Sequence, residues 1–275
     1  MYKDYAARSP MNLRLQTSRL VRKVEDLTRV DIVPRRYWSP IAYDPPPQFW
    51  DRATPLIAVD WDLGHQAQLY QRITPLMNGA TAGGMLGLED ARVLRGVIRH
   101  LRPARVIELG SGHSTRLIRA ATSGEHFVYD PYPSKGVRST GDIVVERKSV
   151  MALPVSEFAI LDANDVLFVD TSHVVKLGGD VNRIILEILP TLRAGVWVHF
   201  HDIFLPWEYP RYVVDKRLCW AEQYLLHAFL AFNTHFRVEL AIHALARTGR
   251  IEPRQAVPGS FWIQRIGGIP EVGLV

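Results

Sequence analysis

The sequence predicts an α/β protein built on a doubly wound, mostly parallel sheet. Short continuous apolar segments alternate with amphipathic ones from residue 88 onward, which is typical of strands buried on both faces and the helices that cover them. A glycine-rich turn joins the first of these strands directly to a helix. The composition agrees, because 275 residues with 47% apolar side chains provide a substantial core.

Each element is predicted from its hydrophobic period. The segment 88–101 places Val93, Leu94 and Val97 on one helical face, whereas 105–109 is a short apolar run between turn residues. Seven strands are expected at 105–109, 126–130, 142–146, 165–170, 195–201, 236–240 and 261–265. Helices are expected at 66–76, 88–101, 114–121, 180–192 and 220–232.

The chain is basic, with 33 Lys and Arg against 28 Asp and Glu. Residues 1–36 hold nine basic and four acidic side chains, which accounts for the whole net charge of +5. Residues 37–275 are therefore neutral overall, and a nucleic-acid partner is not expected. Leu13, Leu20, Val24 and Leu27 have helical spacing, and a proline- and aromatic-rich extended segment follows at 34–55. We therefore predict a cap at 1–80, whose basic arm is a possible homo-oligomer contact, and a main domain at 81–275.

Neither a membrane span nor a disulfide framework is expected. No window approaches the roughly 20 apolar residues that a spanning helix needs. The single cysteine, Cys219, has no partner for an internal disulfide, which fits a reducing compartment. We expect a cytoplasmic protein.

The glycine turn at the end of the first predicted strand is a candidate nucleotide site. Gly110 and Gly112 allow a tight turn before a helix N-terminus, and Asp130 ends the next strand, where a carboxylate suits ribose hydroxyls. Both a dinucleotide and an adenosyl cofactor fit this pattern. A dinucleotide site usually has a third glycine where Thr115 stands, and the negative charge of Glu108 disfavours a pyrophosphate.

The motif Glu108-Leu-Gly110-Ser-Gly112 resembles the E-x-G-x-G motif of class I S-adenosylmethionine (SAM)-dependent methyltransferases. The resemblance implies a seven-stranded Rossmann-like methyltransferase sheet and a turn that holds the methionine part of SAM. It also implies that Glu108 orients the amino-acid end and that Asp130 binds ribose. The cofactor-binding residues expected on this basis are Glu108, Gly110, Ser111, Gly112, Ser114, Thr115, Asp130 and Asp170.

Acidic residues and histidines follow two further strands. Asp170 and His173 come after the predicted strand at 165–170, and His201 and Asp202 end the strand at 195–201. Ligands of an open α/β sheet bind outside the carboxyl ends of its strands, so these four side chains are expected at one rim. His199 lies deeper on the same strand and is expected to be a hydrogen-bonded core histidine.

The run His199-Phe-His-Asp-Ile-Phe-Leu-Pro-Trp-Glu-Tyr-Pro210 resembles a bacterial "methyltransferase 24" type subfamily, related to small-molecule and sugar O-methyltransferases, over about residues 88–245. The resemblance implies a divalent metal held by Asp170, His201 and Asp202. Imidazole is a poor ligand for Mg²⁺, which leaves a metal-free alternative in which His173 or His201 acts as general base beside Asp202. Both mechanisms stay open.

The leading functional hypothesis is SAM-dependent O-methylation of a small molecule or glycan precursor. The alternatives are an NAD-dependent oxidoreductase, which Thr115 and Glu108 disfavour, and a catalytically silent SAM-binding scaffold protein.

Overall fold

The computed structural model describes residues 23–24, 27–28, 47–138 and 144–268. Contacts divide the chain into Met1–Tyr43 and Asp44–Val275. In the first unit the four described residues are helical, and the rest of the predicted amphipathic helix lies outside the described residues. The domain boundary at residue 80 and the oligomer contact of the arm stay predictions.

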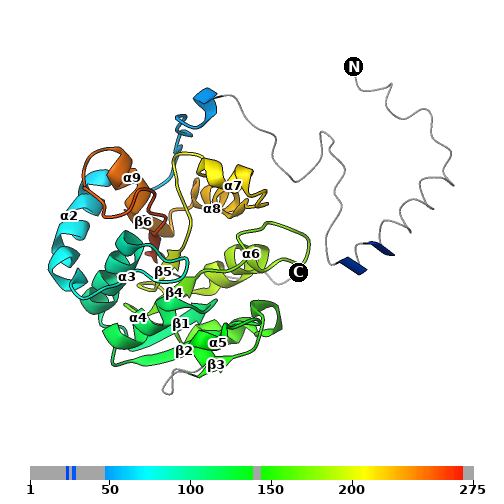
Figure 1. The fold of residues 1–275 in the computed structure, drawn as a ribbon. Coiled ribbons are helices and arrows are strands. Elements are labelled where there is room, and N and C mark those ends of the chain that lie inside the picture. Colours follow the sequence, from blue (N-terminus) through cyan, green and yellow to red (C-terminus); the bar gives the residue numbers. More distant parts are fainter. Residues whose placement is uncertain (1–22, 25–26, 29–46, 139–143, 269–275) are drawn as a thin grey trace, which may run out of the picture. The chain divides into compact units, whose positions relative to one another are not determined.

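Seven strands of the described residues form one sheet in the order β3-β2-β1-β4-β5-β7-β6 (Figure 1). All neighbours are parallel except β7, which is antiparallel to both β5 and β6. The strands are β1 (Arg105–Leu109), β2 (Glu125–Tyr129), β3 (Val145–Glu146), β4 (Val166–Val169), β5 (Trp197–Phe200), β6 (Phe236–Ala241) and β7 (Phe261–Arg265). The predicted fold class, a doubly wound and mostly parallel sheet, is confirmed.

The order of the strands reverses between β1 and β4, which lie side by side with Leu109 opposite Val169. The chain leaves β1 toward β2 and β3 on one side, and it leaves β4 toward β5 on the other. Such a switch point opens a crevice at the carboxyl ends of the two strands. Residues 110–112 and 170–173 follow these ends, so the fold places both predicted motifs at the crevice.

Helices cover both faces of the sheet. On one face α2, α3 and α4 pack on residues such as Val106, Phe168 and Trp262. On the other face α6 and α8 pack on the alternate residues, among them Ile107, Leu167 and Ile263. The helices are α2 (Leu63–Ile73), α3 (Leu88–Leu101), α4 (His113–Ala121), α5 (Lys135–Arg138), α6 (Asp180–Arg183), α7 (Arg211–Asp215), α8 (Glu222–Leu230) and α9 (Ile242–Arg247).

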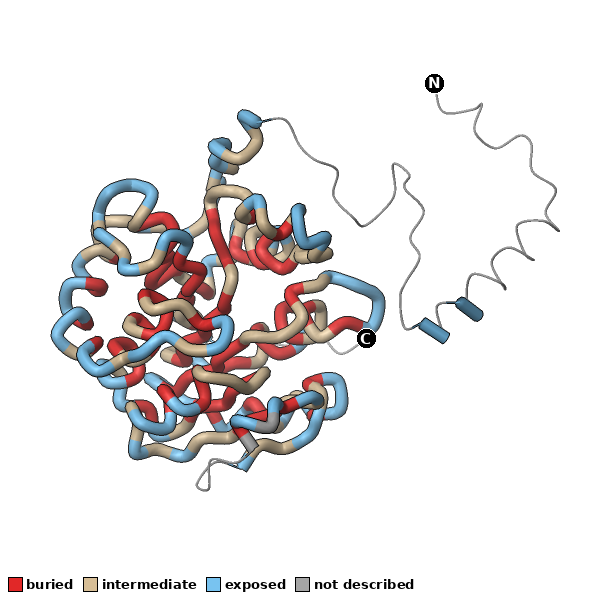
Figure 2. Tube along the Cα trace, viewed as in Figure 1, coloured by how far each residue is buried: buried red, intermediate tan, exposed pale blue. Residues whose placement is uncertain are grey.

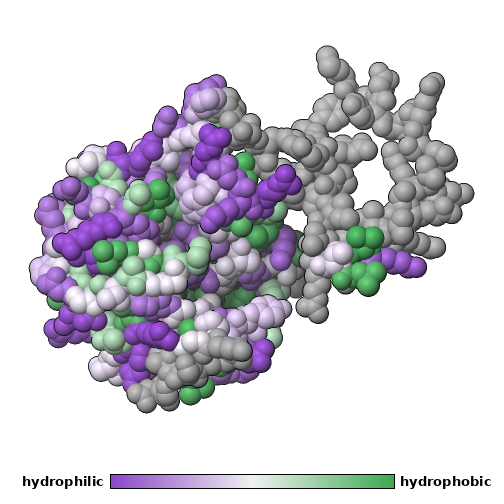
Figure 3. Space-filling view, viewed as in Figure 1, coloured by the Kyte–Doolittle hydropathy of each residue, from purple (hydrophilic) through white to green (hydrophobic). Residues whose placement is uncertain are grey.

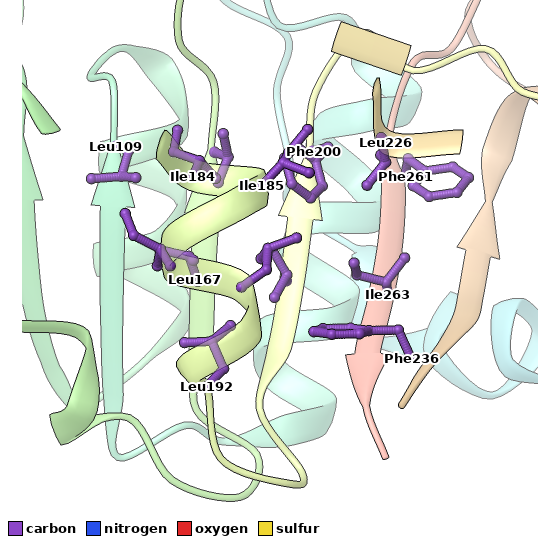
Figure 4. Packing of buried hydrophobic residues seen from close by; sticks show 14 of the residues in the cluster. Leu109, Leu167, Ile184, Ile185, Leu192, Phe200, Leu226, Phe236, Phe261 and Ile263 are labelled. Atoms are coloured by element: carbon purple, nitrogen blue, oxygen red, sulfur yellow. The ribbon is translucent and has the colours of Figure 1, made fainter. Parts of the chain in front are cut away.

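The two apolar layers account for most of the buried residues (Figure 2). Figure 4 shows the second layer, in which Ile184 and Ile185 approach Leu167 and Phe200 on β4 and β5. Burying such side chains stabilises a fold by about 1.5–3 kcal/mol each. Hydrophilic side chains make up much of the face seen in Figure 3. Among the described residues, no helix is long and apolar enough to cross a membrane.

The predicted helix at 180–192 is confirmed as a continuous helical segment over residues 180–191, but it is not a regular α-helix throughout. After α6 the backbone forms a π-helical turn at Ile184–Ile188 and then a 3-10 turn at Leu189–Thr191. Pro190 has no N–H and clashes with the carbonyl four residues earlier, so an α-helix cannot pass through it. The inward-facing apolar positions Ile184, Ile185 and Ile188 are nevertheless buried as predicted.

The segment before α3 belongs to the same compact unit as the sheet. Ala53 forms an antiparallel bridge with Trp207, and the N–H of Thr54 donates to the carbonyl of Pro206 at 2.7 Å. In α2, Gln66 accepts a hydrogen bond from the N–H of Ala241 at 3.0 Å. These contacts fix the segment to the second half of the chain.

Candidate active site

The turn after β1 requires glycine at its first position. Gly110 has φ +89°, and a Cβ there would overlap the carbonyl oxygen of Asp170 on the neighbouring strand connection. At Gly112 φ is −176° and a Cβ would meet nothing within 4 Å. The first glycine therefore lets the β1 and β4 ends approach, while the second lies beside open space at the start of α4.

The buried side chain of Glu108 stabilises this turn through hydrogen bonds. Its buried carboxylate accepts hydrogen bonds from Ser114 Oγ at 2.6 Å and Thr115 Oγ1 at 3.1 Å, and His126 Nε2 lies 2.8 Å from its second oxygen. Thr115 Oγ1 in turn accepts the N–H of Gly112 at 3.0 Å. Because these groups satisfy one another inside the protein, Glu108 shapes the turn through Ser114 and Thr115.

Asp130, at the end of β2, is joined to the same turn. One carboxylate oxygen accepts the N–H and the hydroxyl of Ser111 at 3.0 and 2.5 Å, and the other accepts the N–H of Tyr132 at 2.7 Å. The carboxylate is thus fixed in position at the crevice, where the sequence predicts a ribose contact.

A cavity of about 470 Å³ lies at the switch point. This volume is in the range of small-molecule sites. Of the predicted cofactor residues, Gly110, Ser111, Asp130 and Asp170 line it, whereas Glu108, Gly112, Ser114 and Thr115 are not in its wall. The wall comprises Leu109, Gly110, Ser111, Tyr129, Asp130, Pro131, Tyr132, Ser149, Val150, Met151, Asp170, Thr171, Ser172, Lys176, Gly178, Gly179 and Asp180.

The predicted rim residues Asp170, His173, His201 and Asp202 do come together. His173 Nε2 lies 3.3 Å from Asp170 Oδ1 and 3.9 Å from Asp202 Oδ2. His201 Nδ1 lies 4.0 and 3.4 Å from the same two oxygens. Each imidazole therefore faces both aspartates, and the two histidines alternate with the two aspartates around the site.

A third carboxylate, which is fully buried, lies behind each imidazole, and the sequence did not indicate either one. Glu222 Oε2 is 2.8 Å from His173 Nδ1, and Asp90 Oδ2 is 3.7 Å from His201 Nε2. Glu222 is the first residue of α8, and Asp90 lies in the first turn of α3. We call the six residues the acid–histidine cluster: Asp90, Asp170, His173, His201, Asp202 and Glu222.

The backbone holds this cluster in place. His173 and Asp202 have φ of +58° and +57°, which is rare for residues other than glycine. The carbonyl of His173 accepts the N–H of Glu222 at 3.2 Å, and Asp90 accepts the N–H groups of Gly259 and Ser260 at 3.0 and 2.8 Å. Left-handed backbone at two chemically active residues is typical of functional sites.

A carboxyl group faces each ring nitrogen of His173, and because an ionised carboxylate only accepts hydrogen bonds, this geometry favours a doubly protonated ring. Burial by itself lowers the pKa of His173, but its bonds to Asp170 and Glu222 outweigh burial and raise the pKa to about 10. Burial likewise opposes the charge of His201, and the surrounding carboxylates raise its pKa well above the ordinary value. Burial raises the pKa of Asp170, but the facing histidines lower it to about 2.

The raised pKa values of His173 and His201 affect both mechanisms that the sequence left open, the metal site and the histidine general base. A metal would have to displace a proton from the ring it binds, and the described residues contain no group of three His, Cys, Asp or Glu that could hold an ion. The side chains of Asp170, His201 and Asp202 are therefore not arranged as a metal site here, and the predicted metal stays a prediction. A protonated imidazole cannot accept a proton, so the raised pKa values of His173 and His201 disfavour them as the base, and their predicted role stays a prediction.

His199 is the core histidine that the sequence predicts. Its ring stacks on Phe168 at 4.3 Å, and Nε2 lies 3.1 Å from Ser260 Oγ. Burial, reinforced by the nearby charge of His201, lowers its pKa well below the ordinary value. His199 is therefore neutral and packs inside the sheet.

An aromatic wall stands beside the cluster. The Trp220 ring lies 4.7 Å from the His173 ring, and Tyr212 and Tyr209 meet Trp220 edge-on at 6.1 and 5.9 Å. Burial raises the pKa of Tyr212, and the charges of Asp202 and Asp90 raise it further. The phenol of Tyr212 is therefore within electrostatic reach of the cluster.

Part of the chain matches a known family model. Residues 107–203 match a family model described as a methyltransferase domain. This range includes the glycine turn, Asp130, Asp170 and His173, and it ends just after Asp202. No curated protein matches the chain.

Several solved structures resemble the chain at low sequence identity. The SAH-bound methyltransferase PaMTH1 from Podospora anserina is 14% identical, with a TM-score of 0.42 over 95% of this chain and 100% of that one. The O-methyltransferase TomG from Streptomyces achromogenes, in complex with SAM, is 15% identical, with a TM-score of 0.41 over 76% and 92%. An O-methyltransferase from Bacillus cereus in complex with SAH is 12% identical, with a TM-score of 0.39 over 75% and 92%. Likenesses this distant identify neither a substrate nor a mechanism for the chain.

Proposed function

We propose that the protein transfers a methyl group from SAM to a hydroxyl of a small molecule, a function that the match of residues 107–203 to a methyltransferase family model supports. The observation that carries the proposal is a ligand-sized cavity at the switch point, lined by Gly110, Ser111 and Asp130 on one side and by Asp170 on the other. SAM supplies a methyl group activated by its sulfonium charge. The protein must bind both reactants, align them and receive the proton.

The cofactor side of the site follows from the contacts of the turn. Gly110 has no Cβ, so the end of β1 lies directly against the backbone of Asp170, and both residues contribute to the cavity wall. The Asp130 carboxylate, already oriented by Ser111, faces the ribose hydroxyls in this proposal. Glu108 does not line the cavity, and it stabilises the turn through its hydrogen bonds to Ser114 and Thr115.

The acceptor side follows from the acid–histidine cluster. The acceptor oxygen attacks the methyl carbon, the carbon–sulfur bond breaks with its electron pair going to sulfur, and the hydroxyl proton must leave. We assign Asp202 as the group that takes this proton, because carboxylates in the cluster keep free lone pairs while the histidines carry protons. Its side chain is 20% exposed, and it lies between His173 and His201. The two histidines orient Asp202 and Asp170 and balance part of their charge.

The first experiment separates this proposal from its alternatives. SAM and SAH should raise the melting temperature of the protein, whereas NADH should not; the opposite result would support an oxidoreductase. A screen of small hydroxylated acceptors with methyl-labelled SAM then tests transfer. SAM binding without transfer to any acceptor would favour a silent SAM-binding scaffold. We further expect the protein to act in the cytoplasm.

A second experiment tests the role of Asp202. Asp202→Asn should abolish transfer while SAH affinity stays within a few-fold of wild type. The matched control is Asp162→Asn, an exposed carboxylate that precedes β4 at the opposite end of the strand from Asp170. Turnover should also survive treatment with EDTA, because the ring nitrogens are occupied by protons. Full activity of Asp202→Asn would move the base elsewhere.

A further inference from the structure

The acid–histidine cluster carries more negative than positive charge. Four carboxylates face two imidazoles, so two negative charges remain even when both rings are protonated. A neutral ring would make the excess larger, and a protonated Glu222 would still leave one negative charge. The net charge of the cluster is therefore negative whether its histidines are protonated or neutral.

In the part of the chain that the structure describes, no other cation forms an ion pair with these carboxylates, and every ion pair that they form is with His173 or His201. In the cavity wall, the exposed Lys176 is the single basic residue, against Asp130, Asp170 and Asp180. Asp180 is bonded to the N–H and hydroxyl of Ser172, which are neutral donors.

Two carboxylates of the cluster are accessible to a ligand. The side chains of Asp170 and Asp202 are 36% and 20% exposed, whereas those of the other four members are no more than 8% exposed. Asp170 also lines the cavity and so joins the cluster to the cofactor side. The buried members thus hold two accessible carboxylates at the point where the proposed function places the acceptor.

Aromatic rings border the same place. Trp220 packs on His173, and Tyr212 meets Trp220 edge-on. Carboxylates beside aromatic faces attract ammonium groups, because ring quadrupoles and negative charges both favour a cation. The same surroundings repel a carboxylate or phosphate, since like charges a few ångströms apart interact strongly where water is partly excluded.

We propose that the acceptor bears a positively charged amino group besides the hydroxyl that is methylated, and that anionic acceptors are excluded. This inference rests on the proposed function and adds the chemical class of its substrate. The cavity and the cluster together would bind two cations, the sulfonium of the cofactor and the ammonium of the acceptor, against several carboxylates.

Sinefungin and SAH test the charge of the site without knowledge of the acceptor. Sinefungin carries an amine where SAM carries its methyl group, whereas SAH is uncharged there. By calorimetry, sinefungin should bind about tenfold more tightly than SAH, and Asp170→Asn should remove most of that difference. Asp162→Asn is the control and should leave the ratio unchanged.

The possible outcomes separate the two proposals. Equal affinity for sinefungin and SAH, or a ratio that Asp170→Asn does not change, would overturn the charge inference and leave the proposed function standing. If neither compound binds, the proposed function itself fails, and the inference fails with it.

A second measurement addresses the acceptor directly. Tyramine and 4-hydroxyphenylacetate share a phenol ring and differ in the charge of the side chain. The SAH-loaded protein should bind tyramine about tenfold more tightly in a ligand-observed NMR titration. Equal binding, preference for the acid or binding of neither compound would overturn the inference, while SAH binding in the same samples keeps the proposed function intact.

Discussion

Replacing Gly110 by alanine tests the geometry of the crevice most directly. The residue lies between the ends of β1 and β4, with φ +89°. An added Cβ would overlap the carbonyl oxygen of Asp170 and lie 2.9 Å from its carbonyl carbon. The obstacle is backbone of the adjacent strand connection, which cannot rotate away as a side chain would.

Two costs add up in Gly110→Ala. An L-residue in left-handed backbone costs about 1–2 kcal/mol, and overpacking adds about 1–3 kcal/mol. We therefore expect the free energy of unfolding to fall by about 3 kcal/mol. For a unit of this size that lowers the melting temperature by about 6 to 12 °C. Because relief of the clash would push Asp170 away from the turn, SAH affinity should fall as well. Denaturant unfolding and calorimetry measure the two effects.

Gly112→Ala is the matched control in the same motif. Its backbone is extended, and the new Cβ would touch nothing within 4 Å. The free energy of unfolding should therefore change by less than about 1 kcal/mol. Equal destabilisation by the two substitutions would contradict this explanation. It would mean that the motif needs glycine flexibility at both positions, and not the close approach of Gly110 to the backbone of Asp170.

Three further predictions concern the hydrogen bonds of the site. Glu108→Ala should lower the free energy of unfolding by about 3 kcal/mol in denaturant titrations, because it leaves the buried partners Ser114 and His126 unsatisfied; a loss below about 1 kcal/mol would contradict this. Asp130→Asn should weaken SAH binding about tenfold in calorimetry, because a charge-assisted acceptor becomes partly a donor; unchanged affinity would remove Asp130 from the site. His173 keeps its proton in the folded protein up to a pKa of about 10, against 6.5 as the ordinary value. Raising the pH from 6.5 to 10 should therefore destabilise wild type more than His173→Gln in unfolding curves recorded across that window, and parallel curves would contradict the shift.

Most of the sheet was predictable because buried parallel strands are continuous apolar runs. The predicted strand at 105–109 and helix at 88–101 agree residue for residue with β1 and α3. The short helices α7 and α9 were missed, since five or six residues show too little of the helical period to be recognised. The π-helical turn before Pro190 was missed because its five residues are too few for its period to be distinguished from that of an α-helix.

The site was predictable only where its residues lie next to a strand end. Asp170, His173, His201 and Asp202 follow β4 and β5, so the topology alone brings them together. Glu222 reaches His173 from a helix 49 positions further along the chain, and no local pattern encodes that contact. The protonation of His173 was equally hidden, because it depends on having a carboxylate at each ring nitrogen.

The place of β7 in the sheet has a consequence for how the chain matures during synthesis. This strand fills the gap between β5 and β6, and residues just before it hold Asp90 behind His201. Until residues 261–265 leave the ribosome, β5 has an unpaired edge, which invites pairing with other chains. The two N–H groups that hold Asp90, those of Gly259 and Ser260, are synthesised immediately before β7, so the cluster lacks this support until the last strand of the sheet is available.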